Sequence, residues 1–260
     1  LFRSPFSPLK QVTINGRDYD LNTINGIGVD SDGNILIGRN RHLIKIDAAT
    51  GKGIAVWEVP EGNRAVTSPR ANDKGEIYLT SLFAEDKNFV LKQSASDPST
   101  FDLVRTIELP GRILAREFDM TPDGLTLYFP NPGSPYIQKY TSKEGIKYTR
   151  EEDITSIAAG CNAIAIGPGN TIFTAVRSSG VVPATFHFRD DANKRMWTLP
   201  LPELNGAEAR GIGVSAGGDT LIFCSWDKGG GFYRYVLRKK EASVQQTPAS
   251  RSGAKAVRKE

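Results

Sequence analysis

A tight turn that recurs along the chain constrains the fold more than any other feature. In residues 111–131, GRILAREFDMTPDGLTLYFPN, an extended run is followed by an Asp-Gly turn and a second extended run. Four looser copies occur, and the turn glycines are spaced at 42, 49, 45 and 49 residues: Gly33, Gly75, Gly124, Gly169 and Gly218. Units of this length that contain only strand signals are typical of propeller blades.

The repeat predicts the domain organisation. Five units occupy most of the 260 residues, so we expect one all-β domain over residues 1–237 and a polar, basic, mobile tail over residues 238–260. The last unit lacks a convincing fourth strand, whereas LKQVTIN at residues 9–15 alternates as a strand without an evident partner. We therefore predict a β-propeller of five four-stranded blades, closed by the N-terminal strand. The alternative is part of a six- or seven-bladed ring.

The basic charge belongs to the tail. Residues 238–260 carry seven Lys and Arg against two Glu, a net +5, while the whole chain is +4, which leaves the body at about −1. We therefore expect no nucleic-acid partner. Apolar runs are far shorter than the roughly 18 residues of a membrane helix, so we expect no membrane partner either. The chain begins at Leu1, so a leader could precede it, and a secreted or periplasmic location is favoured.

Two segments carry a resemblance to known proteins. REFDMTPDGLTLYFPNPGSPYIQKYT at residues 116–141 and NGIGVDSDGNILIGRNRHLIKID at residues 25–47 resemble the SMP-30/gluconolactonase-like propellers, and more broadly the NHL-like and YVTN-like ones. The resemblance implies a small-molecule enzyme with a divalent cation, most often Ca²⁺, over the central channel. Asn25 and Asn162 match the amide ligands of that family, and Asn131 stands roughly where it has an Asp. The expected N-terminal glutamate has no clear counterpart.

Blade geometry predicts where a site would lie. Inner strands begin, and second strands end, at the end of the propeller opposite the Asp-Gly turns. Aligned turn glycines therefore place five side chains around one mouth of the channel: Asn25, Thr67, Arg116, Asn162 and Arg210. Further residues are expected around them, with Glu117 and Glu208 close by: Arg39, Arg41, His42, Asn131, Arg177 and Trp226.

These residues predict a chemistry. Arg116 and Arg210 could stabilise charge on an anionic substrate, and His42 could activate water. Arg39, Arg41, Asn131, Arg177 and Trp226 would contact the substrate. The chain has only two histidines, which excludes a three-histidine metal site. The arginines could instead bond to strand-end carbonyls and the nearby glutamates.

Two functions remain open at this point. The first is a lactone or ester hydrolase acting on a small, possibly anionic molecule. The second is a propeller without catalytic activity that binds a ligand or another protein. The sequence leaves the oligomeric state open.

Overall fold

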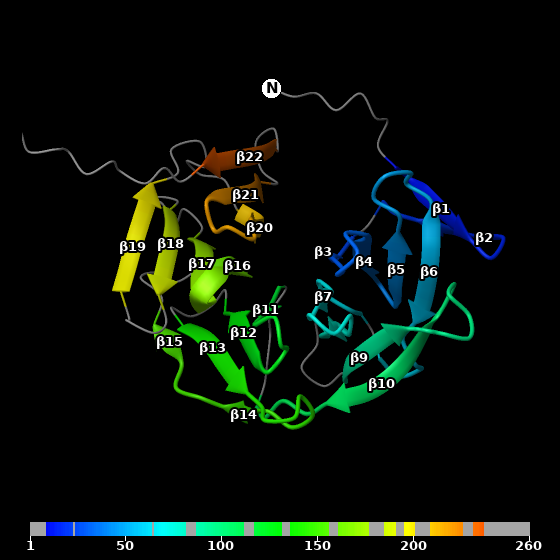
Figure 1. Cartoon of the computed structure of the whole chain (residues 1–260), viewed down its shortest axis with the longest axis horizontal. Helices are drawn as coiled ribbons and strands as arrows, with labels where there is room; N and C mark the ends of the chain where they lie inside the picture. The colour runs from blue at the N-terminus through cyan, green and yellow to red at the C-terminus, as the bar shows by residue number, and fades with distance from the viewer. Residues whose placement is uncertain are drawn as a thin grey trace, which may run out of the picture.

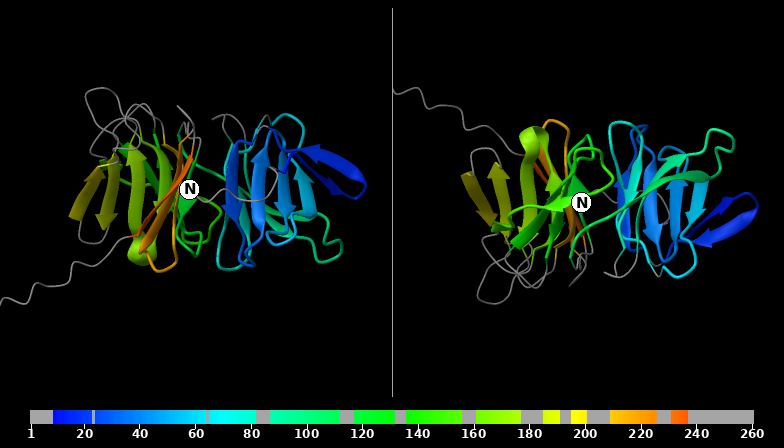
Figure 2. Two further views of the ribbon diagram at one scale, coloured as in Figure 1. Left: turned by 90° about the horizontal axis from the view of Figure 1, so that it is seen from above. Right: turned by 90° about the horizontal axis from the view of Figure 1, so that it is seen from below.

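The chain is all-β in the computed structural model, and its antiparallel sheets surround a common axis as in a propeller (Figure 1). The structure describes residues 9–22, 24–63, 65–81, 87–111, 117–131, 136–155, 161–176, 185–190, 195–200, 209–225 and 231–236. Seen from the side, most strands run roughly along the short axis of the molecule, and most turns lie toward its two ends (Figure 2).

Each sheet is a meander that runs outward from the axis. The first sheet contains β3 (Gly26–Val29), β4 (Ile35–Arg39), β5 (His42–Ile46) and β6 (Gly53–Glu58). The second contains β7 (Arg70–Ala71), β8 (Ile77–Leu79), β9 (Asn88–Gln93) and β10 (Phe101–Ile107). The third contains β11 (Asp119–Met120), β12 (Thr126–Pro130), β13 (Tyr136–Thr141) and, both paired with β13, β14 (Thr149–Arg150) and β15 (Ile154–Thr155).

Two more sheets complete the described part of the chain. The fourth contains β16 (Cys161–Ile166), β17 (Thr171–Val176), β18 (Thr185–Asp190) and β19 (Arg195–Pro200). A single 3-10 turn, η1 (Pro168–Asn170), joins β16 to β17. The fifth contains β20 (Ala209–Val214), β21 (Thr220–Ser225) and β22 (Gly231–Val236). No helix among these residues is long and apolar enough to span a bilayer.

The recurring turns are confirmed. All five turn glycines have positive φ, with values of 84° at Gly33, 72° at Gly75, 72° at Gly124, 65° at Gly169 and 72° at Gly218. This backbone conformation is costly for residues with a Cβ, so glycine is favoured at each turn. The repeat in the sequence therefore reports a repeat in backbone geometry.

Apolar side chains fill each junction between neighbouring sheets. Leu36 and Leu43 of the first sheet pack with Leu79 and Phe89 of the second. Further clusters join the second sheet to the third, the third to the fourth, and the fourth to the fifth. Alternate residues of each middle strand thus face opposite neighbours, as the two-residue period of a strand requires. This packing fixes where each inner strand meets the axis.

The first two strands of the first sheet approach closely the segment that leads into β7. A Cβ added at Gly28 would lie 2.0 Å from the carbonyl oxygen of Pro69, and one added at Gly38 would lie 2.0 Å from that of Thr67. Contacts this short exclude a side chain, so glycine at these positions permits the sheets to converge.

The predicted closure by the N-terminal strand is wrong. β1 (Gln11–Ile14) pairs with β2 (Arg17–Asp20) in a separate hairpin instead of pairing with the last sheet. The turn residues Asn15 and Gly16 have φ of 51° and 73°, as in a type I′ hairpin turn. The hairpin then packs Val12, Ile14, Tyr19 and Leu21 on the outer face of the first sheet.

The predicted count of five four-stranded blades is not confirmed. Four sheets have at least four strands, whereas the fifth has three within the described residues. The described strands form an arc that is open between the fifth and first sheets (Figure 1). The predicted tail, residues 238–260, lies outside the described part of the chain.

Candidate functional site

Charged side chains meet where the inner strands of the second, third and fourth sheets converge. Arg70 begins β7, Asp119 begins β11, and Glu117 lies two residues earlier. Arg70 and Asp119 occupy the same position relative to their turn glycines, Gly75 and Gly124. We call Arg70, Glu117 and Asp119 the axial cluster.

The axial cluster links four sheets. Arg70 Nη1 donates to the carbonyl oxygen of Ile27 in β3 at 3.0 Å. Arg70 Nε lies 3.2 Å from Asp119 Oδ1, and the backbone N–H of Ile166 in β16 donates to Asp119 Oδ2 at 2.7 Å. Inner strands have one edge without a strand partner, and buried backbone groups at such an edge need hydrogen bonds from elsewhere. Arg70 and Asp119 supply them.

Glu117 is held differently. It accepts a hydrogen bond from the backbone N–H of Ile164, but its Oε2 atom is buried and has no hydrogen-bond partner among the residues that the structure describes. Burial raises the pKa of Glu117 to about 7, the charge of Asp119 adds to this effect, and Arg70 only partly opposes it. Burial also raises the pKa of Asp119, again against Arg70. Near neutral pH, Glu117 can therefore both accept and donate a proton.

Three predicted site residues lie away from the axial cluster. Arg39, Arg41 and His42 belong to the tight turn between β4 and β5, which the β1–β2 hairpin contacts. Arg39 pairs with Asp20 of that hairpin at 2.8 Å, and Arg41 donates to the carbonyl oxygen of Val59 at 2.7 Å.

His42 is enclosed by the same contacts. Its ring stacks edge-on against Tyr19, with centroids 5.5 Å apart, and its Nε2 lies 3.9 Å from Glu58 Oε2. Burial lowers the pKa of His42, with Glu58 opposing and Arg17, Arg39 and Arg41 reinforcing the effect. The structure thus gives this turn a role in holding the hairpin.

The predicted amides are only partly described. The Asn25 side chain donates to the carbonyl oxygen of Val66 at 2.9 Å, which ties the first sheet to the second. Asn131 follows β12 and is half-buried. Asn162 and Arg210 lie within β16 and β20, but their side chains are outside the description, as are Arg116, Arg177 and Trp226 entirely. Within the described residues, no three His, Cys, Asp or Glu are grouped to hold a metal.

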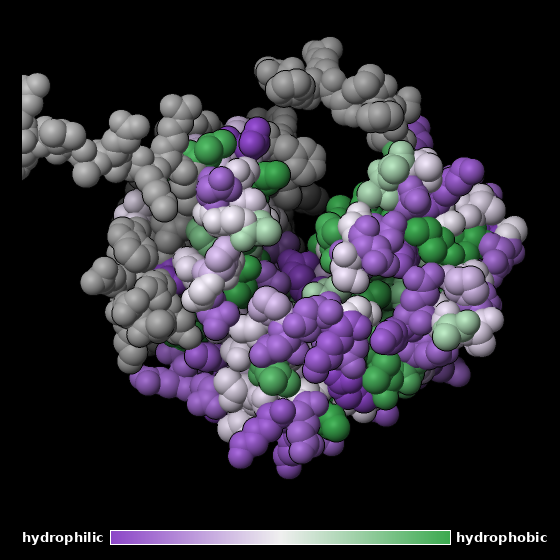
Figure 3. All heavy atoms as spheres, in the orientation of Figure 1, coloured by the Kyte–Doolittle hydropathy of each residue, from purple (hydrophilic) through white to green (hydrophobic). Residues whose placement is uncertain are grey.

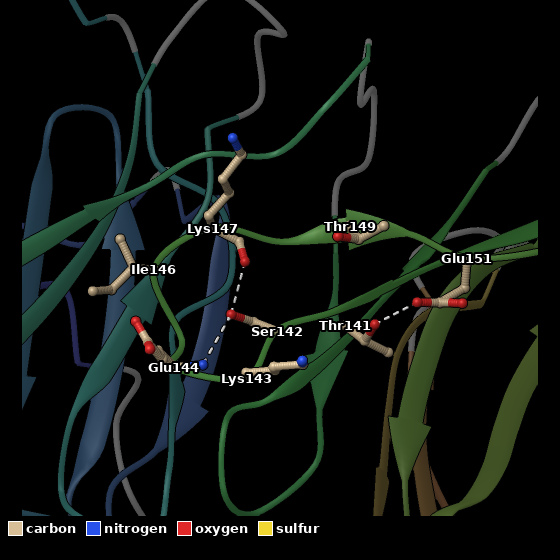
Figure 4. Close-up of a pocket in the computed structure, with 8 residues that line it drawn as sticks. All are labelled: Thr141, Ser142, Lys143, Glu144, Ile146, Lys147, Thr149 and Glu151. Atoms are coloured by element: carbon tan, nitrogen blue, oxygen red, sulfur yellow. Dashed lines mark hydrogen bonds between the residues drawn. The ribbon is translucent and has the colours of Figure 1, made fainter.

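Two cavities lined by described residues lie away from the axial cluster. One of about 640 Å³ is lined by the turn between β13 and β14, including Lys143, Glu144 and Lys147 (Figure 4). The Ser142 hydroxyl donates to the carbonyl oxygen of Lys147 at 2.8 Å, and Thr141 donates to Glu151 at 2.5 Å. These bonds are local to one strand pair, so this cavity is a surface depression beside a turn. A second cavity, of about 370 Å³, lies between the turns of the first two sheets.

Sequence reasoning did not predict the axial cluster. It places Glu117 near the mouth of the channel only as a partner for arginines, and it does not single out Arg70 or Asp119 as site residues. A signal existed, because two carboxylates flank Phe118 in a segment expected to form an inner strand. Phe118 is fully buried between the second and third sheets, which turns both carboxylates toward the fourth.

Comparisons with known proteins support the fold. No protein-family model matches the sequence, and no curated protein shows significant sequence similarity. Among solved structures, hydrazine synthase of Kuenenia stuttgartiensis is 16% identical with a TM-score of 0.56, over 82% of this chain and 59% of that one. The match therefore spans under two thirds of the hydrazine synthase chain.

Virginiamycin B lyase from Staphylococcus aureus is similar over 89% of this chain and 78% of its own, at 16% identity and a TM-score of 0.53. A catalytically inactive variant of that lyase with quinupristin gives 15% identity and a TM-score of 0.55 over the same shares. These neighbours are β-propeller proteins, so the propeller-like arrangement is supported. Membership of the gluconolactonase-like family is not shown.

Proposed function

We propose that this chain is a small-molecule enzyme with its site at the axial cluster, and that Glu117 transfers the proton. One observation carries the proposal: Glu117 has a buried oxygen that no described residue hydrogen-bonds, and its pKa is about 7. Carboxyl groups tuned toward neutral pH are concentrated at catalytic sites. Lactone or ester hydrolysis is the reaction class that the sequence resemblance suggests. One structural neighbour with a similar fold was solved with quinupristin, and for that reason small molecules are the ligands we would test first.

The proposed reaction needs one group that both accepts and returns a proton. Ionised Glu117 takes a proton from water as the water oxygen bonds to the carbonyl carbon. Glu117 then returns that proton to the leaving oxygen as the carbon–oxygen bond breaks. Arg70 and Asp119 do not react. They hold the inner strands in register, and the charge of Asp119 helps to set the pKa of Glu117.

Initial rates across a panel of lactones and esters from pH 5 to 9 test the proposal. The wild-type rate should rise through about pH 7, and Glu117→Gln should lose about 100-fold or more while remaining folded. Asp119→Asn should move the midpoint to lower pH. Turnover that Glu117→Gln leaves unchanged contradicts the assignment of Glu117.

The anionic substrate class is part of this proposal. The panel should pair neutral lactones with carboxylate-bearing ones of similar size. Arg116→Ala and Arg210→Ala should then weaken turnover of the carboxylate-bearing members selectively. Equal losses on both classes would assign the two arginines to holding the sheets together.

No metal takes part in the proposed steps. The sequence resemblance suggests Ca²⁺ held by Asn25, Asn131 and Asn162. Asn25 donates its amide N–H to Val66, which leaves its Oδ1 as a possible ligand, but a hard cation prefers several carboxylates, and no group of three acidic, histidine or cysteine side chains occurs among the described residues. A Ca²⁺ site nevertheless stays open to test, by a melting shift with Ca²⁺ that Asn25→Ala and Asn162→Ala remove.

A binding module without catalytic activity is the second candidate. It is favoured because Arg70 and Asp119 make hydrogen bonds and an ion pair between sheets, so that Glu117 is the member of the axial cluster with a free oxygen among the described residues. Ligand-induced melting shifts that Glu117→Gln abolishes, in protein that turns over no member of the panel, would select this candidate.

A further inference from the structure

A polar cavity lies between the turns of the first two sheets. Its volume is about 370 Å³, near the lower limit of the range of about 300–1,000 Å³ for small-molecule sites. The β3–β4 and β7–β8 turns line it together with parts of β5, β8 and β9, whereas none of the three residues of the axial cluster does. Hydrophilic residues, in purple, lie on both sides of the junction between these two sheets (Figure 3). The cavity is therefore a candidate site separate from the axial cluster.

The charged side chains that line this cavity balance in number. Three lysines and three aspartates line it: Lys45, Lys74, Lys92, Asp30, Asp32 and Asp73. Asp30 and Lys45 neutralise each other, because they form an ion pair at 2.7 Å in which each side chain is 6% exposed. The other four residues are exposed. The ligand that fits the cavity therefore depends on how the remaining charges are arranged.

Lys45 brings an incompletely used donor to the cavity. Its ammonium group has three N–H donors, and two of them bond to Asp30 Oδ2 and Gln93 Oε1, each at 2.7 Å. Within the described part of the chain, the third has no acceptor. Burying an ionised group is costly unless its hydrogens find acceptors, so the cavity has to supply an oxygen to Lys45. A carboxylate oxygen bonds a charged donor more strongly than water does.

The unpaired charges of the lining are segregated. Lys92 lies on β9 and Lys45 on β5, so the strands present positive charge. Asp32 and Asp73 lie in the two turns, and neither they nor Lys92 forms a side-chain hydrogen bond or ion pair with a described residue. Lys74, also in a turn, acts in addition on acidic groups outside the cavity. The cavity thus has a positive strand side and a negative turn side.

We propose that this cavity binds a small zwitterion of the amino acid class, with its carboxylate at the strand side and its ammonium group at the turn side. A ligand with only negative charge would be repelled by Asp32 and Asp73. A ligand with only positive charge would be repelled by Lys45 and Lys92. Ile77, which is 3% exposed, gives the carbon atoms of the ligand an apolar wall.

Thermal melting of the full chain with each standard amino acid at about 10 mM is the first test. At least one should raise the melting temperature by about 2 °C or more, as a dissociation constant of about 1 mM requires. Calorimetric titration then compares this amino acid with its N-acetyl derivative, which lacks the ammonium group, and with its amide, which lacks the carboxylate. The parent amino acid should bind about 10-fold more tightly than either, because each derivative has lost one charge-assisted contact.

Single substitutions locate the bound ligand. Lys92→Gln and Asp73→Asn each remove one exposed charge from the cavity, so each should weaken binding of the parent amino acid about 10-fold and leave the circular dichroism unchanged. The matched controls are Lys143→Gln and Glu144→Gln, which remove one exposed charge of each sign from the cavity of about 640 Å³ and should bind like wild type. Glu117→Gln should also bind like wild type, which separates this inference from the proposed reaction.

Three results would overturn the inference. The first is a melting temperature that no standard amino acid raises. The second is tighter or equal binding of inorganic phosphate or of either derivative. The third is binding that Lys92→Gln and Asp73→Asn leave unchanged, or that the control substitutions weaken to the same extent.

Discussion

Two regions of the propeller hold buried charges in different ways. At the turn end, Asp30 and Lys45 form an ion pair at 2.7 Å, and both side chains are only 6% exposed. At the axial cluster, one buried oxygen of Glu117 has no hydrogen-bond partner within the described part of the chain. Both regions contain ionisable groups removed from water. The partners available to each group decide whether it serves the fold or can take part in chemistry.

The Asp30 carboxylate of the turn-end pair is satisfied on all sides. Asp30 also accepts hydrogen bonds from the N–H groups of Asp32 and Asn34, at 3.0 and 2.8 Å. Lys45 donates to Gln93 of the second sheet at 2.7 Å. Burial works to raise the pKa of Asp30, but Lys45 and Asn34 outweigh it and hold that pKa below its ordinary value. Such a carboxylate stays ionised and holds the two sheets together.

Glu117 shows the opposite balance. It has one backbone donor, and a neighbouring carboxylate stands beside it, so burial prevails and its pKa rises. The comparison teaches that depth of burial does not by itself identify a reactive group. A buried charge with a full set of partners contributes to structure, whereas one with an incomplete set has a pKa that is free to shift.

Breaking the turn-end pair should have the largest effect. Asp30→Asn leaves the Lys45 ammonium buried with only Gln93 as a described partner, and removing one member of a buried pair costs about 3–5 kcal/mol. Urea unfolding at pH 7 measures this loss of unfolding free energy. Asp32→Asn, an exposed change in the same turn, should stay within about 0.5 kcal/mol. A loss below about 1 kcal/mol for Asp30→Asn would show that the Asp30–Lys45 pair contributes little to stability, and its contrast with Glu117 would be lost.

Glu117 should make stability fall as pH rises. Its folded pKa of about 7 lies above its ordinary value of 4.5, so the folded state binds the proton more tightly. The stabilisation is complete below pH 4.5 and is lost as pH rises through 7, by about 2–3 kcal/mol. Asp119, whose pKa is also raised, adds to the fall.

Glu117→Gln should therefore match wild type near pH 4.5 and exceed its unfolding free energy near pH 8. Urea unfolding at both pH values measures the difference. Glu144→Gln, at an exposed turn, should follow wild type at both. If Glu117→Gln has the same pH dependence as wild type, the carboxyl group is ordinarily solvated and its proposed role in catalysis loses its basis.

The propeller-like arrangement could be predicted from the sequence because it depends on a local feature, the recurring glycine turn. Each turn glycine with positive φ marks the same point of a repeat, and strands on either side follow from alternating residues. The N-terminal hairpin was equally local, and its Asn15-Gly16 signal was visible, but the preceding strand was assigned to a distant partner. Such a turn between two alternating segments favours a hairpin over a long-range pairing.

The candidate site was less predictable because its energetics come from long-range contacts. Asp119 and Glu117 are distinguished by the N–H groups of Ile166 and Ile164 and by Arg70, which belong to other sheets. Aligning the repeats gives each residue a position along its strand but not its partners across a junction. Arg39 illustrates the limit, since its ion pair with Asp20 depends on a hairpin that was not expected.

The smallest expected effect on stability comes from His42, and it tests whether burial shifts the pKa of a base as it shifts that of Glu117. It is a half-buried base whose pKa is lowered chiefly by burial, against the opposing charge of Glu58. Its folded state favours the neutral ring, so stability is present above the ordinary pKa of 6.5 and is lost as pH falls through the lower folded value. We expect the free energy of unfolding to fall slightly as pH drops from 6.5 toward 5. Urea unfolding should show this dependence of the unfolding free energy on pH in wild type and not in His42→Gln.

Arg17→Gln is the graded control. It removes one of the cations that lower the pKa of His42, so it should reduce the pH dependence without abolishing it. An unchanged slope in His42→Gln would assign the acid sensitivity to other groups and leave the hairpin contact independent of pH.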